Sequence, residues 1–190
     1  MKLPAVLAFV VLGLVAGLTA CSQPAPALDI FGQIPQFELT AQNGQPFHSQ
    51  ALAGKIWVAD FMYTTCPGPC PRMTSQMREV ENAVLKIPDV RLVSFTVDPK
   101  EDTPPVLTAY AKTHGAVSSI WYFLTGPVPT LQMLDRDAFK LGNLDGTLQH
   151  STRFVLVDRQ GRIRGYYDTS DSGSIPKVIS DIYELARERA

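Results

Sequence analysis

The sequence lacks an excess of charge of either sign. Its 17 lysines and arginines stand against 18 aspartates and glutamates, which gives the 190-residue chain a formal net charge of −1. Proteins that bind nucleic acid need surplus positive charge to neutralise phosphates, so we expect no nucleic-acid partner. The sequence also shows no run of like charges and no internal repeat. With 45% hydrophobic residues, the length fits one folded domain with an appendage.

Cysteine is scarce as well, and the first of the three cysteines belongs to the N-terminal segment. Lys2 precedes an apolar stretch from Leu3 to Leu18, which predicts a secretory signal. The segment ends in Leu18-Thr19-Ala20-Cys21, which resembles a bacterial lipobox, where the cysteine becomes the lipidated first residue. The alternative is an uncleaved membrane anchor, and either form places the domain on the exported, periplasmic side of a bacterial membrane. We predict a lipoprotein signal peptide at 1–20, a lipidated tether at 21–33 and a folded domain at 34–190.

The folded domain alternates strands with helices. Asn43-Gly44 lies between two alternating segments, which is a strong hairpin signal. The stretch from Ile56 to Tyr63 is almost continuously apolar, as expected for a strand buried on both faces. The order of elements predicts an α/β, thioredoxin-like three-layer sandwich with a central mixed sheet and an N-terminal β-hairpin. The expected elements are a hairpin at 37–48, strands at 56–63, 90–97, 121–125 and 149–158, a return strand at 162–167, and helices at 71–85, 103–115, 128–139 and 174–187.

The remaining cysteines, Cys66 and Cys70, lie between the first core strand and the helix that follows it. Pro67, Pro69 and Pro71 alternate through this turn, and each disfavours helical geometry in the residue before it. We therefore predict that the helix begins at Pro71, with Cys70 at its N-cap. The positive end of the helix dipole would then favour the Cys70 thiolate over the thiol.

Three chemistries fit a pair of thiols at this turn. A dithiol oxidoreductase uses a low-pKa thiolate, but its usual spacing is Cys-x-x-Cys, and the spacing here is one residue longer. A thiol peroxidase uses one attacking and one resolving cysteine. A metal site uses both sulfurs together, and paired thiolates select Cu(I) first and zinc next. A purely structural disulfide is disfavoured, because closing so short a loop adds little stability.

His150 favours the metal site among these alternatives. It precedes the strand that lies beside the first core strand in thioredoxin-like folds, where dithiol oxidoreductases usually carry a cis-proline facing the cysteines. This chain has no proline between Pro129 and Pro176. A Cys₂His set suits trigonal Cu(I), whereas structural zinc needs a fourth protein ligand. The other histidines and two helix methionines are interpreted as structural: His48, His114, Met73 and Met77.

Four segments together resemble the Sco/SenC family over nearly the whole mature domain. They occur in order at 60–71, 96–104, 121–126 and 150–158, and they combine a Cys-Pro-x-x-Cys-Pro element with a distant histidine. The resemblance implies a membrane-tethered copper chaperone that assists assembly of the binuclear copper centre in subunit II of cytochrome c oxidase. It implies copper, as Cu(I), Cu(II) or both, with Cys66, Cys70 and His150 as the ligands.

The resemblance also implies further roles around this site. Cys66 and Cys70 would form a redox-active pair that reduces the target site's cysteines from the disulfide to the thiol form and becomes a disulfide itself. Asp98 matches a motif position of the family and is either a weak fourth, oxygen ligand of Cu(II) or a turn-forming residue. Thr64 and Thr65 are expected to hydrogen-bond the ligands from behind. The implied partners are cytochrome c oxidase subunit II, another periplasmic copper chaperone, a thioredoxin-like reductant, and the membrane through the lipid anchor.

Two functions of other classes stay open at the level of the sequence. One is an extracytoplasmic thiol-disulfide oxidoreductase that stores no metal. The other is an extracytoplasmic interaction domain with an inert disulfide. The role of His150 separates the oxidoreductase from the chaperone, and the reactivity of the cysteines separates both from the inert domain.

Overall fold

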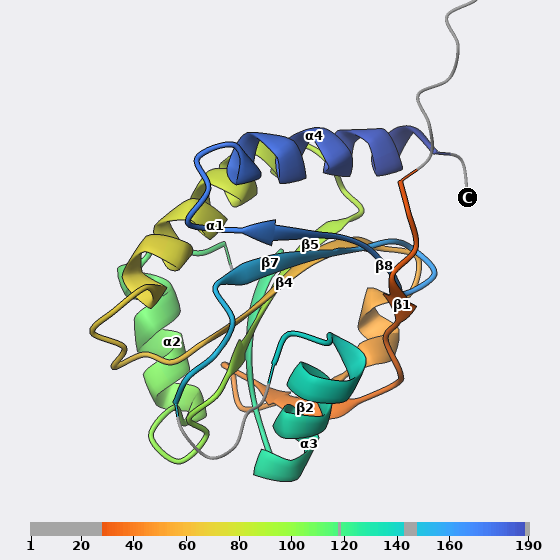
Figure 1. The fold of residues 1–190 in the computed structure, drawn as a ribbon. Helices are drawn as coiled ribbons and strands as arrows, with labels where there is room; N and C mark the ends of the chain where they lie inside the picture. The colour runs from red at the N-terminus through yellow and green to blue at the C-terminus, as the bar shows by residue number, and fades with distance from the viewer. Residues whose placement is uncertain (1–27, 118, 143–147, 189–190) are drawn as a thin grey trace, which may run out of the picture.

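The computed structural model describes residues 28–117, 119–142 and 148–188. Within them, eight strands form one mixed sheet in the order β1-β8-β7-β4-β5-β6-β2-β3 (Figure 1). The strands are β1 (Gly32–Gln33), β2 (Glu38–Ala41), β3 (Pro46–His48), β4 (Ile56–Met62), β5 (Val90–Thr96), β6 (Trp121–Thr125), β7 (Arg153–Val157) and β8 (Arg162–Asp168). The helices are the 3₁₀ turn η1 (Ser49–Leu52), α1 (Cys70–Val84), α2 (Pro104–Thr113), α3 (Val128–Met133) and α4 (Ser174–Arg187).

Strand β4 lies near the middle of the sheet, and all seven of its residues are buried. It runs parallel to β5 and antiparallel to β7. Its side chains alternate between two cores. Trp57 and Phe61 pack on the side of α3 and η1, whereas Ile56 and Val58 pack on the side of α1, α2 and α4. This burial on both faces explains the continuous apolar run of the sequence.

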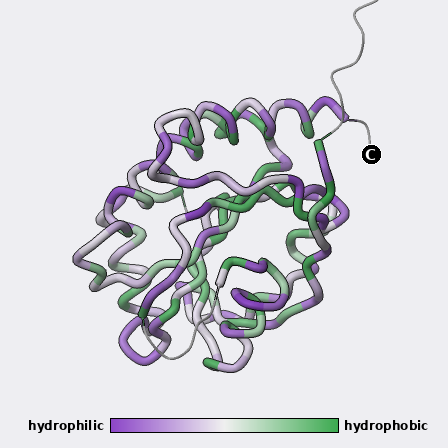
Figure 2. Tube along the Cα trace, viewed as in Figure 1, coloured by the Kyte–Doolittle hydropathy of each residue, from purple (hydrophilic) through white to green (hydrophobic). Residues whose placement is uncertain are grey.

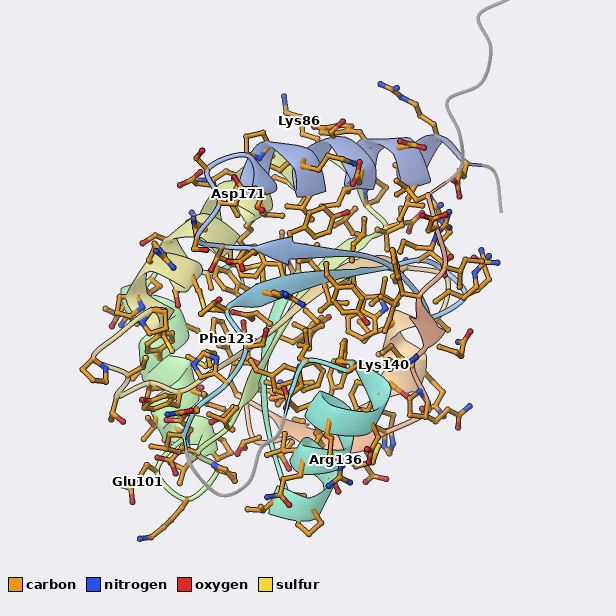
Figure 3. The ribbon with its side chains drawn as sticks, in the orientation of Figure 1. Lys86, Glu101, Phe123, Arg136, Lys140 and Asp171 are labelled. Carbon is orange, nitrogen blue, oxygen red and sulfur yellow. The ribbon has the colours of Figure 1, made fainter. Side chains whose placement is uncertain are left out.

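Helices cover both faces of the sheet and give the predicted three-layer α/β architecture. Figure 2 shows the hydrophobic residues concentrated in the central strands and on the inner sides of the helices. In Figure 3, Phe123 of β6 lies within the molecule, whereas Lys86, Glu101 and Arg136 project outward. Phe123 is fully buried, and those three charged residues are exposed. The hairpin predicted around Asn43-Gly44 is confirmed as β2–β3, with Gly44 at a φ of 77°.

Helix α1 begins one residue earlier than predicted, at Cys70, and the position before it is Pro69 rather than Cys70. Pro69 has helical dihedral angles, φ −75° and ψ −24°, and its carbonyl accepts a bond from the Met73 N–H at 3.0 Å. Pro71 therefore occupies the second helical position, where no N–H donor is required. The gain from helix formation here outweighs the steric bias that proline places on the preceding residue.

The third predicted helix is not uniform, and the strand expected at 149–158 is shorter. After α3 the chain forms a π-helical turn, Leu134–Ala138, which places the Phe139 N–H against the Leu134 carbonyl. Strand β7 pairs with β4 only from Trp57 to Ala59, while β4 continues along β5 as far as Met62. The sheet therefore opens between β4 and β7 where β4 leads into the cysteine turn. His150 lies in the loop before β7, beside this opening.

The folded domain includes Leu28 to Gln33, which the sequence analysis had assigned to the tether. Gly32 and Gln33 form β1, which pairs with β8. Arg164 donates from Nη2 to the Leu28 carbonyl at 2.8 Å, and from Nε to the carbonyls of Leu28 at 3.2 Å and Asp29 at 3.3 Å. Among the described residues, no helix combines the length and the apolar character needed to cross a membrane. The predicted signal peptide and Cys21 lie outside the described residues.

Candidate metal centre

The cysteine turn is anchored by a buried carboxylate on a neighbouring loop. Asp102, which is fully buried, accepts bonds from the backbone N–H and the hydroxyl of Thr64. The same carboxylate accepts a bond from Thr96, the last residue of β5. These bonds tie the start of the turn to the end of the adjacent strand. Thr64 therefore holds the loop in place through Asp102, rather than by bonding the cysteines as predicted.

The structure brings Cys66, Cys70 and His150 together. The ligand atoms of the three residues all lie within 4.8 Å of one another. The Cys70 sulfur lies 3.1 Å from His150 Nε2. Cys66 is 8% exposed and Cys70 only 1% exposed, and both are free thiols. Residues that are 80 positions apart in the sequence thus converge at the open end of the sheet.

A hydrogen bond fixes which nitrogen of His150 is available. Nδ1 lies 2.9 Å from the carbonyl oxygen of Ser151, and a carbonyl can only accept, so Nδ1 carries the proton. Nε2 is therefore the unprotonated nitrogen, and it faces the Cys70 thiol. Burial lowers the pKa of His150, which favours the neutral ring. The ring also meets the edge of Tyr63 at a centroid distance of 5.8 Å.

The two thiols have opposite pKa shifts, and the prediction for Cys70 is wrong. Burial raises the pKa of Cys70 well above its ordinary value, and the neighbouring Cys66 and Asp60 add to the effect. These effects outweigh the helix N-terminus that the sequence analysis relied on. Burial also raises the pKa of Cys66, but hydrogen bonds from Cys70, the Gly68 backbone and Tyr63 outweigh it, so the pKa is lowered. Cys66 is therefore the thiol that ionises first.

A buried carboxyl group lies behind the site, on the same strand that leads into it. Asp60 of β4 is 1% exposed and accepts a bond from the Ser94 hydroxyl at 2.6 Å. Ser94 in turn accepts a bond from the Trp121 indole at 2.9 Å. Burial raises the pKa of Asp60 to about 7, although the Ser94 bond acts in the opposite direction. Asp60 thus places a titratable charge near Cys70.

Asp98 does not join the group of converging ligand atoms. Its backbone N–H bonds the Thr96 hydroxyl, and its carbonyl accepts the N–H groups of Glu101 and Asp102. These contacts fit the turn-forming alternative. His48 lies at the sheet edge, 3.6 Å from Glu38.

His114 packs against Tyr110 at the end of α2, with ring centroids 4.3 Å apart and the ring planes tilted by 45°. Burial lowers the pKa of His114 and so disfavours its charged form. This opposes the expectation that a cationic histidine favours the helix C-terminus. Met73 and Met77 are fully buried in the core beneath α1, in agreement with their structural interpretation.

Sequence reasoning missed two carboxylates at this end of the sheet. Asp60 is an acidic residue inside an apolar strand. This position is unusual, and it could have identified Asp60 from the sequence as a candidate residue of the site. Asp102 belongs to the same segment as Asp98, but it does not precede a proline and carries no comparable local signal. The buried state of each depends on contacts with β5 and the cysteine turn, which the sequence pattern does not specify.

Comparison with known proteins identifies the family. The model of the SCO1/SenC family matches residues 31–187. This chain belongs to the SCO1/SenC family. It is 29% identical over 184 residues to an SCO1 protein homolog of Bacillus subtilis, which covers 91% of this chain and 95% of that protein.

Solved structures of other Sco proteins have the same fold. A SCO1/SenC family lipoprotein from Bacillus anthracis is 33% identical, with a TM-score of 0.74 over 82% of this chain and 96% of that one. BsSco, described as a member of the Sco family of cytochrome c oxidase assembly proteins with a disulfide switch, is 26% identical, with a TM-score of 0.75 over 86% and 100%. ScoI of Bradyrhizobium japonicum with copper bound is 25% identical, with a TM-score of 0.67 over 81% and 99%. These likenesses confirm the predicted thioredoxin-like fold.

The donor set of this Sco-family protein fits a soft metal ion. Two thiols and one unprotonated imidazole nitrogen converge, and these are the groups that select Cu(I) or zinc over hard cations. Among the described residues, no fourth cysteine, histidine or carboxylate joins these three to complete a four-coordinate structural zinc site. The residues present therefore fit copper better than zinc.

Proposed function

We propose that this Sco-family protein binds copper through Cys66, Cys70 and His150 and delivers it to the binuclear copper site in subunit II of cytochrome c oxidase. The observation that carries the proposal is the convergence of two thiols and the free His150 Nε2 within 4.8 Å. The copper-bound relative and the relative described as an oxidase assembly protein support the cargo and the destination. Copper is here the cargo of the protein.

The two thiols of the proposed site differ in how readily they lose a proton. Cys66 has the lowered pKa and supplies the first thiolate, while the buried Cys70 keeps its proton beside His150 Nε2. Binding of copper replaces that proton, which leaves to solvent. His150 stays neutral and oriented by its bond to the Ser151 carbonyl. Copper then leaves by exchange to another soft donor set.

The same two sulfurs give the site a redox switch. Oxidation of both thiols to a disulfide removes two electrons and two protons, and it withdraws both sulfur ligands from the metal. A thioredoxin-like reductant returns the pair to the binding form, and another periplasmic copper chaperone supplies the metal. Delivery thus depends on the redox state of the pair.

The anchor is part of the proposal. Lipidation of Cys21 after removal of residues 1–20 would hold the domain on the periplasmic side of the membrane, and the B. anthracis relative described as a lipoprotein supports this. The chain enters the domain at Leu28, beside β8 and the end of α4, whereas the cysteine turn lies at the other end of β4 (Figure 1). The site would therefore face away from the point of attachment, toward a partner.

The decisive experiment compares His150→Ala with His48→Ala in the reduced full-length protein. We expect the parent and His48→Ala to bind one equivalent of Cu(I), measured by competition with a chromophoric chelator. His150→Ala should bind at least about 100-fold more weakly, since it loses a metal ligand rather than a residue behind one. Equal affinities in the parent and His150→Ala would overturn the assignment of the ligands.

A second function, thiol-disulfide reduction, is favoured by the opposite pKa shifts of the cysteines. The lowered pKa and slightly greater exposure of Cys66 suit an attacking thiolate, and the buried Cys70 suits a resolving thiol. Reduction of a test disulfide by His150→Ala separates the two functions. An exchange rate close to that of the parent, together with weak copper binding, would assign the histidine to the metal alone.

A further inference from the structure

The three proposed ligands leave open what occupies a fourth position around copper. Asp98 is outside the group of converging atoms. An aspartate would also add a negative charge to a site that already holds two thiolates, which together outweigh the single charge of Cu(I). A neutral soft donor is therefore better suited than a carboxylate to a fourth ligand position in this buried site.

Met62 offers such a donor. It is the last residue of β4, and strand alternation places it on the same face as Ile56 and Val58, toward α1. Met62 is 1% exposed and forms one small buried cluster with Cys66 and Cys70, separate from the two large cores of the sheet. The side chain that carries this thioether thus belongs to the same buried cluster as the two thiols.

The other described methionines do not share this position. Met73 and Met77 pack in the core between the sheet and α1, and Met133 packs against the core on the opposite face. All three serve as ordinary apolar filling of their cores. Met62 alone among the described methionines belongs to the cluster of the cysteines.

We propose that the thioether of Met62 is a fourth, weak ligand of the bound copper, completing a Cys₂HisMet set with Cys66, Cys70 and His150. This inference rests on the copper binding proposed above. A thioether ligand beside two sulfurs and a histidine would add no charge, and it would stabilise Cu(I) more than Cu(II) because the thioether is soft. Met62 thus biases the site toward the reduced ion, and Asp98 keeps its structural role in the turn.

Selenomethionine gives a direct test, because a selenium ligand is distinguishable from sulfur. The full-length protein is labelled with selenomethionine, loaded with Cu(I) and measured by X-ray absorption at the copper edge. We expect copper–selenium scattering in the parent and in Met73→Leu, and its loss in Met62→Leu. Leucine keeps the volume of methionine, so the variant should fold with a stability cost under about 1.5 kcal/mol.

Copper affinity supplies an independent readout. We expect Met62→Leu to weaken Cu(I) binding about tenfold and Cu(II) binding less, while Met73→Leu matches the parent for both ions. Absence of copper–selenium scattering in a parent that binds Cu(I), or its persistence in Met62→Leu, would overturn the role of Met62 and leave the proposed function intact. A parent that binds no copper, or a His150→Ala variant that binds as well as the parent, would overturn the proposed function itself.

Discussion

Two buried aspartates at opposite ends of the sheet show how differently the two ends are built. Asp60, near the end of β4, is 1% exposed, and Asp158, just after the antiparallel β7, is 3% exposed. Burial alone would raise the pKa of both carboxyl groups. Asp60 receives one hydroxyl bond, and its pKa is raised to about 7. Asp158 receives bonds from Arg162 and Arg164, which outweigh burial and lower its pKa.

One end of the sheet is thus stabilised by ion pairs between buried charges, whereas the other end carries the reactive thiols. At the end where the chain enters, Arg164 joins Asp158, Glu188 and the carbonyl of Leu28 in one charged network. At the site, two thiols, an unprotonated imidazole nitrogen and Asp60 form no ion pair with a lysine or arginine of the described residues. The end of the sheet that carries the site can therefore accommodate a metal cation. The end where the chain enters already contains the arginines that balance its carboxylates. The following predictions test this contrast, from the largest expected effect to the smallest.

Removing Arg164 should give the largest loss of stability. Arg164→Met leaves Asp158 buried with fewer partners and frees the Leu28 carbonyl, so we expect a loss of about 3–5 kcal/mol in the free energy of unfolding. Urea denaturation at neutral pH measures it. The control is Arg162→Met, whose side chain is 36% exposed and whose loss should be about 1 kcal/mol. Equal losses of stability in the two variants would show that the burial of Arg164 with Asp158 gives it no larger contribution than the more exposed Arg162.

Neutralising Asp60 should raise the free energy of unfolding, whereas removing Arg164 should lower it. Because its folded pKa is raised from 3.8 to about 7, the native state holds an extra proton between these values, and stability falls as the pH rises from about 4 to about 7. Asp60→Asn should remove this fall and make the protein about 2–4 kcal/mol more stable than the parent at pH 8.

Urea denaturation between pH 4 and pH 8 measures this effect. The exposed Glu79 on α1 supplies the control, since Glu79→Gln removes a carboxylate without changing a buried group. A parent whose stability is flat over this pH range would contradict the account of Asp60. A flat curve for Asp60→Asn beside a sloping curve for Glu79→Gln would support it.

The smallest effect concerns the thiolate of Cys66. Tyr63→Phe removes one of the hydrogen bonds that lower the pKa of Cys66, so the pH of half-maximal alkylation should rise by about 0.5 unit. The rate of alkylation by iodoacetamide as a function of pH measures it. Tyr110→Phe serves as the control, because the Tyr110 hydroxyl pairs with Thr74. The same shift in both variants would argue against a specific bond from Tyr63.

The local pattern of the sequence was sufficient for most of the fold. The apolar run of β4 and the Asn43-Gly44 turn each predicted the element that forms, because each signal lies within one element. The wrong predictions concern segments whose structure depends on pairing with a strand that is distant in the sequence. The 149–158 segment was predicted as one long strand, but only Arg153–Val157 forms it, paired with β8 along this length and with β4 from Val155 to Val157.

The candidate site divides in the same way. The spacing of Cys66 and Cys70, the missing proline and the distant His150 are properties of the sequence, and they predicted the three residues that converge. The sequence by itself thus determined which chemical groups are available. The tertiary structure decided their state, because burial and neighbouring charges act through space. They raise the pKa of Cys70, lower that of Cys66 and leave Nε2 of His150 unprotonated, and the packing places Met62 in one buried cluster with the two cysteines.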